Sequence, residues 1–164
     1  MSAIKSRILV AYYSYSGITR AAAEEIGRRV GADLFEIQPA KAYPAGYDAV
    51  VAQAKEEISS GFRPALKQAG PGLDAYDIVL LGSPNWWSTI APPVASYLSA
   101  SGLAGKKIAA FVTHGGGGLA RAGADIVKLS PGADPLEPAA FRDSDVRRGK
   151  AALDNWLRRL KLID

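Results

Sequence analysis

Cysteine is the residue whose absence excludes most. The chain has 164 residues, none of them cysteine, and its single histidine is His114. Disulfides, iron–sulfur clusters held by cysteine and metal sites built from several cysteines or histidines are therefore excluded. A chain without disulfides is compatible with the reducing interior of a cell, and we expect a cytoplasmic protein.

Long hydrophobic runs are missing as well. No apolar stretch approaches the ~20 residues that a membrane-spanning helix needs, so we expect no membrane span. The opening residues, MSAIKSR, are too few and too polar for a secretory signal. Hydrophobic residues make up 48% and charged residues 22% of the chain, which is ordinary for a globular protein. We expect a single domain over residues 1–164.

Acidic residues are the scarcer of the two charge types. The chain has 16 aspartates and glutamates against 20 lysines and arginines, which gives a net charge of +4. Much of the basic surplus lies in VRRGK (146–150) and RRLK (158–161). We interpret these segments as solvated helix faces, and the alternative is a docking surface for an acidic partner. Nucleic acid is not expected as a partner, because no basic run is interleaved with aromatic residues.

Apolar residues along the chain alternate between strand and helix patterns. Strands are predicted at residues 7–13, 33–37, 77–82 and 106–113, with a weak, proline-containing fifth strand within 133–141. Helices are predicted at residues 19–30, 47–60 and 91–101, before residue 129, and at 144–160. This order predicts an α/β fold of three layers, with a doubly wound, five-stranded parallel sheet between helices. Ligands bind beyond the carboxyl ends of such strands, so the loops that follow strands one, three and four are the candidate functional edge.

The first of these loops is SYSGIT, at the end of the first strand. A strand that leads into a helix presents free backbone N–H groups and the positive end of the helix dipole, which suits a phosphate. The loop lacks the lysine of a triphosphate-binding loop and the glycine pattern of a dinucleotide fingerprint, so we expect a monophosphate. The alternative is an ordinary helix cap. The candidate residues are Ser14, Tyr15, Ser16, Gly17, Ile18 and Thr19.

The spacing of Ser14, Ser16, Gly17 and Thr19 resembles the phosphate loop of flavodoxins. The order of strands and helices along the whole chain is also similar to that family. The resemblance implies FMN as the cofactor, with its phosphate in this loop, and a strand order of 2-1-3-4-5. A phospho-receiver domain on the same fold is excluded, because the aspartates that it needs after the first and third strands are missing.

The second loop, GSPNWWSTIAPP (82–93), has two adjacent tryptophans at a strand end. Packing alone explains one tryptophan there, but an indole is also flat and able to stack on a planar ring. The loop resembles the Gly-Ser/Thr-Pro-x-Trp-Trp pattern of a flavodoxin-like subfamily. The resemblance implies that the flavin ring is flanked by Pro84, Asn85, Trp86 and Trp87.

The third loop, THGGGG (113–118), follows the fourth predicted strand. Its glycines let the backbone approach a planar ligand closely, and a flexible turn is the alternative. The resemblance implies contact with the pyrimidine edge of the flavin by Thr113, His114, Gly115, Gly116 and Gly117. His114 is either an exposed loop residue or a neighbour of the flavin. In the segment 43–66 we expect a mainly structural role, with Tyr43 or Tyr47 at the rim of a pocket.

Two functions remain open, beside a less favoured alternative in which the domain has lost its flavin and serves as a scaffold. The first is an FMN-binding redox protein that carries electrons between partners, and the alternative is an FMN-dependent NAD(P)H:quinone-type oxidoreductase. The second function needs a pocket over the ring, and a tryptophan pair that covers the ring favours the carrier. The expected partner is a redox protein or a small acceptor, and the positive charge favours an acidic one. No catalytic residue is assigned, because the cofactor itself carries the electrons.

Overall fold

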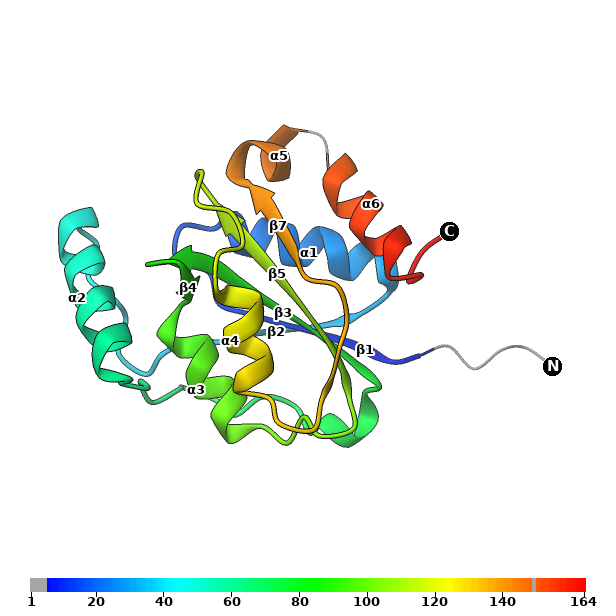
Figure 1. Cartoon of the computed structure of the whole chain (residues 1–164), viewed down its shortest axis with the longest axis horizontal. Coiled ribbons are helices and arrows are strands. Elements are labelled where there is room, and N and C mark those ends of the chain that lie inside the picture. The colour runs from blue at the N-terminus through cyan, green and yellow to red at the C-terminus, as the bar shows by residue number, and fades with distance from the viewer. Residues whose placement is uncertain (1–5, 149) are drawn as a thin grey trace.

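A twisted β-sheet of mostly parallel strands forms the centre of the computed structural model, which describes residues 6–148 and 150–164 (Figure 1). Its path runs in the order β2-β1-β3-β5-β6, which matches the predicted order once the short strands are set aside. The polar start of the chain lies outside the described residues. The strands are β1 (Ile8–Tyr12), β2 (Asp33–Glu36), β3 (Ile78–Trp86), β4 (Thr89–Ile90), β5 (Lys107–His114), β6 (Asp134–Pro135) and β7 (Ala139–Arg142).

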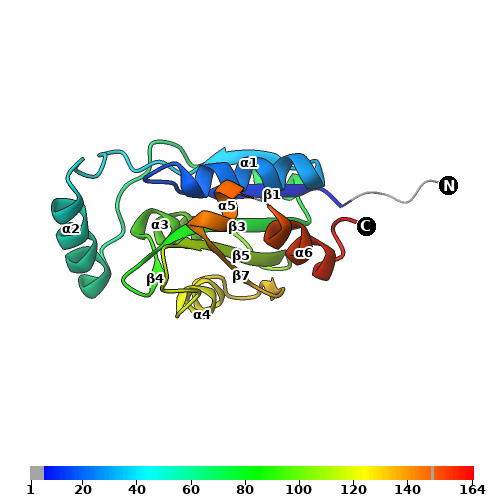
Figure 2. The same ribbon diagram turned by 90° about the horizontal axis from the view of Figure 1, so that it is seen from above.

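Helices cover both faces of the sheet (Figures 1 and 2). One face carries α1 (Ile18–Val30), α5 (Asp143–Arg148) and α6 (Ala151–Arg159). The other face carries α3 (Pro92–Ala100) and α4 (Ala122–Lys128). The helix α2 (Tyr47–Ser60) stands beside the sheet, at the end toward which the strands run, and a short 3₁₀ helix spans Leu73–Ala75. None of the helices described in residues 6–148 and 150–164 has the length and apolar character to cross a membrane.

The core consists of two clusters, one on each face of the sheet. Alternate residues of β1 belong to opposite clusters, since Leu9 packs with α3 and α4, and Val10 packs with α1 and α6. The largest fully buried side chain is Trp156 of α6, whose Nε1 donates a hydrogen bond to the carbonyl of Glu137 at 2.8 Å. The candidate loops lie at the carboxyl ends of β1, β3 and β5, next to the core cluster that contains Tyr13 and contacts Trp86.

The structure differs from the predicted elements in three places. The fifth strand is two pieces, β6 and β7, and Pro138 between them lacks the N–H that a continuous ladder needs. The C-terminal helix is divided into α5 and α6, with Lys150 in a left-handed conformation at φ 60°. The third strand continues to Trp86 and turns back into β4, so residues predicted as a loop form a β-hairpin.

Candidate functional site

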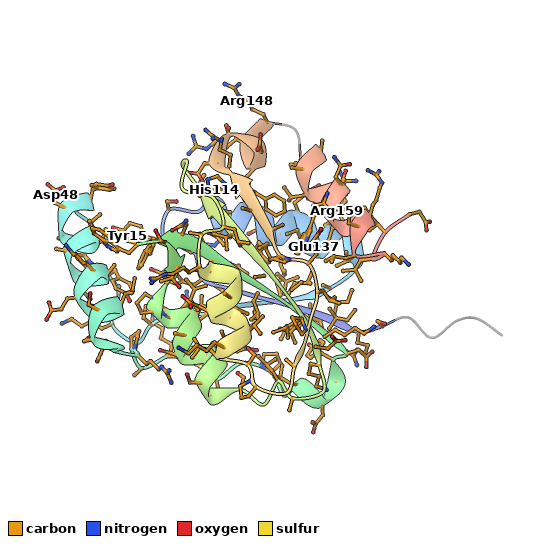
Figure 3. The ribbon with its side chains drawn as sticks, in the orientation of Figure 1. Tyr15, Asp48, His114, Glu137, Arg148 and Arg159 are labelled. Atoms are coloured by element: carbon orange, nitrogen blue, oxygen red, sulfur yellow. The ribbon has the colours of Figure 1, made fainter. Side chains whose placement is uncertain are left out.

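The carboxyl ends of the strands enclose the largest cavity identified in the described part of the chain, about 530 Å³ in volume. It adjoins the loop after β1, the β3–β4 hairpin, the end of β5, the start of α5 and one side of α2. Figure 3 shows Tyr15 and His114 at this end of the sheet, with Asp48 of α2 beyond Tyr15. The predicted residues that line it are Tyr15, Ser16, Ile18, Pro84, Asn85, Trp86, Trp87, Thr113, His114 and Gly115.

The phosphate loop ends in Gly17, which caps α1 in a left-handed conformation at φ 99°. The N–H of Gly17 donates to the Ser14 hydroxyl at 3.1 Å, which closes the turn. Within the helix, the N–H of Ala21 bonds to the Gly17 carbonyl, so the preceding N–H groups have no helical partner. The first turn of α1 carries no acidic side chain. Its positive dipole end is therefore available to an anion.

The three hydroxyls of this loop have different surroundings. Ser16 lines the cavity, whereas Ser14 bonds to Gly17 and lines a smaller neighbouring pocket. Thr19 is buried, and its hydroxyl forms a 2.7 Å hydrogen bond with the hydroxyl of Thr113 at the end of β5. Of the three hydroxyls, the structure places only that of Ser16 in the cavity.

Asn85 connects the hairpin with the glycine loop. Its Nδ2 donates to the Gly118 carbonyl at 2.7 Å, and its Oδ1 accepts the N–H of Ser88 at 3.0 Å. A Cβ on Gly117 would lie 3.1 Å from the same Nδ2, so glycine permits this close approach. Neither Gly116 nor Gly117 lines the cavity. The side chain of Asn85 therefore holds two of the candidate loops in a fixed relative position.

Trp86 and Trp87 point to different neighbours. The Trp86 ring contacts Tyr13, Tyr15 and Tyr43, with centroids 5.5, 5.9 and 5.1 Å away and edge-to-face geometry. It is the tryptophan that packs against the core. Trp87 is 45% exposed, and its Nε1 donates to the Val51 carbonyl of α2 at 3.0 Å.

Tyr13 and Tyr43, which contact the Trp86 ring, line the smaller neighbouring pocket and not this cavity. Burial raises the pKa of the Tyr13 hydroxyl well above its usual range. Burial and a hydrogen bond to Glu57 do the same for the pKa of Tyr43. Tyr43 donates to Glu57 Oε1 at 2.6 Å, and Gln53 donates to the other carboxylate oxygen at 2.9 Å. The Tyr43–Glu57 bond ties the residues just before α2 to the last turn of this helix, beside the Trp86 ring.

Apart from tyrosines, titratable groups of the cavity lining are found only at its strand-end side. His114 and Asp143 line it, and in residues 6–148 and 150–164 no lysine or arginine does. His114 pairs in register with Arg142 of β7, which places Asp143 at the same edge of the sheet. The Nδ1 of His114 is buried without a hydrogen-bond partner in the described structure, so the imidazole contributes to the lining through its other atoms.

Five residues of the lining were not among the predicted site residues, and four of them were missed altogether. Asp143 directly follows β7. The sequence predicted the fifth strand only weakly, so the end of that strand, and with it the position of Asp143, was not located. The others come from α2, whose helix was predicted but whose position was not; their i, i+3, i+4, i+7 spacing was the available signal. Tyr47 had been expected at the rim of a pocket. The α2 residues are Tyr47, Val50, Val51 and Ala54.

Comparison with known proteins agrees with this architecture. A flavoprotein structure from Bacteroides eggerthii has a TM-score of 0.78 and 29% identity, covering 93% of this chain and 96% of its own. One from Bacteroides uniformis has a TM-score of 0.80 and 26% identity, with 94% and 99% covered. A Lactobacillus acidophilus flavoprotein, solved in complex with FMN, has a TM-score of 0.73 and 24% identity, with 87% and 97% covered.

Two further comparisons concern sequence alone. None of the curated proteins that were compared matches the chain. The family model described as Flavodoxin matches residues 7–160, which is nearly the whole chain. The protein belongs to the flavodoxin family.

Proposed function

We propose that this protein binds FMN in the cavity and serves as an electron carrier between redox partners. The observation that carries the proposal is the composition of the cavity lining. Ser16 and Ile18 at the start of α1, Trp86 of the β3–β4 hairpin and His114 of β5 all line the same cavity. Family membership and the FMN complex of the Lactobacillus acidophilus protein support the choice of cofactor.

Different residues of the chain would hold the phosphate and the ring of FMN. The start of α1 and the Ser16 hydroxyl bind the phosphate, since both offer donors and neither is occupied by an acidic side chain. Trp86 and Tyr15 would give the ring an aromatic neighbour, and His114 would lie beside it in the same lining. When bound, FMN supplies reversible transfer of one or two electrons.

The phosphate assignment is tested with Ser16→Asp and the matched control Ser99→Asp on the exposed surface of α3. A carboxylate about 4 Å from the phosphate costs about 4 kcal/mol at an effective dielectric constant near 20. We expect Ser16→Asp to weaken FMN binding by about 100-fold or more, and Ser99→Asp to have no effect. Fluorescence titration of the apoprotein with FMN measures both.

Riboflavin, which lacks the phosphate, makes the test specific. Its affinity should change little in Ser16→Asp, because there is no anion for the new carboxylate to repel. Equal losses for FMN and riboflavin would show that Ser16 does not face the phosphate. The carrier role is tested in the same cuvette: NAD(P)H alone should leave the flavin bands of the wild-type protein unchanged.

One observation favours the alternative, an FMN-dependent oxidoreductase. The sequence suggested that the two tryptophans cover the ring together. In the structure Trp86 packs into the tyrosine cluster and Trp87 binds α2, so the cavity continues between them and that helix. Bleaching of the flavin by NAD(P)H without any protein partner would select this function over the carrier.

A further inference from the structure

One side of α2 lines the cavity, and Val50 on this side also belongs to the core cluster beside the sheet. Tyr47, Val50, Val51 and Ala54 line the cavity, and we call these four residues the cavity face of α2. Their spacing of i, i+3, i+4 and i+7 places them on one stripe of the helix. Val50 and Ala54 are buried, whereas Tyr47 is 79% exposed. The cavity face therefore runs from a closed, apolar floor to an open aromatic end.

Exposed aromatic side chains gather around the same cavity. Six large hydrophobic side chains are exposed among the described residues, and three of them are aromatic residues that line it: Tyr15, Tyr47 and Trp87. Single exposed apolar residues are common on proteins, but a group around a cavity marks a binding site. Tyr15 contacts the Trp86 ring, whereas Tyr47 lies on α2 and Trp87 bonds to it. Tyr47 and Trp87 therefore belong to the α2 side of the cavity.

The charge distribution limits what the α2 side of the cavity binds. Apart from tyrosines, the titratable groups of the lining, His114 and Asp143, come from the strand-end side and not from α2. Lys55 lies near Trp87, with its Nζ 5.1 Å from the indole centroid. Lys55 is not part of the cavity lining. An anionic ligand would find no countercharge on the cavity face, so an uncharged one is favoured.

We propose that the cavity face of α2 and Trp87 form a second subsite, which binds a flat, uncharged aromatic compound beside the flavin. The proposal rests on the proposed function, because that function supplies the flavin beside the subsite. It also names a substrate class for the oxidoreductase alternative. Valine and alanine at the floor accept a planar ring without steric conflict from large side chains. Tyr47 and Trp87 provide aromatic surfaces at the open end.

The position of α2 is fixed by contacts that leave its cavity face free. Trp87 donates to the Val51 carbonyl at 3.0 Å, and Tyr15 donates to the Pro44 carbonyl, just before the helix, at 2.6 Å. Both bonds use backbone acceptors, so the valine and alanine side chains remain available. The two bonds that hold α2 beside the strand ends therefore do not use the side chains of the cavity face.

The test uses 2-methyl-1,4-naphthoquinone as the probe and the protein loaded with oxidised FMN. Because probe and flavin are both oxidised, no electrons move, and equilibrium dialysis reports binding alone. Val51→Asp places a carboxylate on the cavity face, and the matched control is Val127→Asp on the exposed side of α4. Both changes put aspartate in place of a helical valine, so their intrinsic effects on helix stability are similar.

We expect Val51→Asp to weaken binding of the probe by about tenfold or more, because the new charge loses solvation when the ring binds. The probe is titrated at saturating FMN, so a change in FMN affinity does not enter the comparison, and Val127→Asp should change neither affinity. Tyr47→Ala removes a largely exposed side chain and should leave the fold intact. It should lower the affinity for the probe by about threefold. A sulfonated, anionic form of the probe should bind the wild type more weakly than the neutral form.

Several results would overturn the subsite. Unchanged probe affinity in both Val51→Asp and Tyr47→Ala would remove the cavity face from the binding site. Displacement of FMN by the probe would show that the cavity holds one ligand only. Failure of the proposed function is seen separately, as absence of FMN binding to the wild type. The Val51→Asp and Val127→Asp comparison is then made on the apoprotein, where the same difference in probe affinity is expected.

Discussion

One wall of the cavity is made by strand ends and the loops that leave them, and the other wall is made by α2. The strand-end wall is held by buried contacts: the Thr19–Thr113 hydroxyl pair, the Asn85 bridge and the cluster around Trp86. The α2 wall is held mainly by two hydrogen bonds from other parts of the chain. Trp87 donates to the Val51 carbonyl of α2, and Tyr15 donates to the Pro44 carbonyl just before it. A rigid wall suits a resident cofactor, and a lightly held wall suits a ligand that enters and leaves.

Replacement of the two tryptophans is expected to give the largest difference between the walls. Trp86→Ala removes a ring that contacts three tyrosines and should lower the free energy of unfolding by about 3 kcal/mol. Trp87→Ala removes a half-exposed ring and should cost about 1 kcal/mol. Urea unfolding of both variants, monitored by circular dichroism, measures the two losses. Similar losses would mean that the two walls are equally firm.

The buried threonine pair tests the strand-end wall with an intermediate effect. Thr113→Val leaves the buried Thr19 hydroxyl without its partner and should cost about 1–3 kcal/mol. The double change Thr19→Val with Thr113→Val removes both hydroxyls, so it should cost less than the two single changes added together. Urea unfolding of the three variants completes the cycle. Additive costs would show that the two hydroxyls do not depend on each other.

The same variants examine the assignment of Thr19 that came from the sequence. There Thr19 was a candidate phosphate ligand, and in the structure its hydroxyl faces Thr113. If it serves only this internal bond, Thr19→Val changes the affinities for FMN and riboflavin by the same factor. A larger loss of affinity for FMN than for riboflavin would show that Thr19 contributes to binding the phosphate.

The sequence predicted the central strands of the sheet well because β1, β3 and β5 are buried on both faces. Such strands are continuous apolar runs, as in IVLLG of β3, and glycines such as Gly31 end the helices between them in the left-handed conformation. The β3–β4 hairpin was not predicted. Its two turn residues, Trp87 and Ser88, adopt positive φ angles of 53° and 69°, and neither is the glycine or asparagine that usually marks such a turn.

The site was predictable only as far as local sequence determines it. The three loops are local features, and the sheet brings most of their residues to one cavity. The partner of Thr19 lies 94 positions away, and the position of α2 depends on the indole of Trp87, which is 36 positions from Val51. A helical pattern predicts which side of α2 is apolar, but not whether that side faces the sheet or a cavity.

The smallest expected effect concerns the bond that positions α2. Trp87→Phe keeps an aromatic ring but removes the Nε1–H that donates to Val51, at a cost of about 1 kcal/mol. The loss should be local, because α2 makes fewer contacts with the sheet than α1 does. Amide hydrogen exchange should therefore become about fivefold faster in α2, while β1 and β3 keep their protection. Faster exchange in both α2 and the strands would mean that the two walls open together, and the cavity would then be a single cooperative unit.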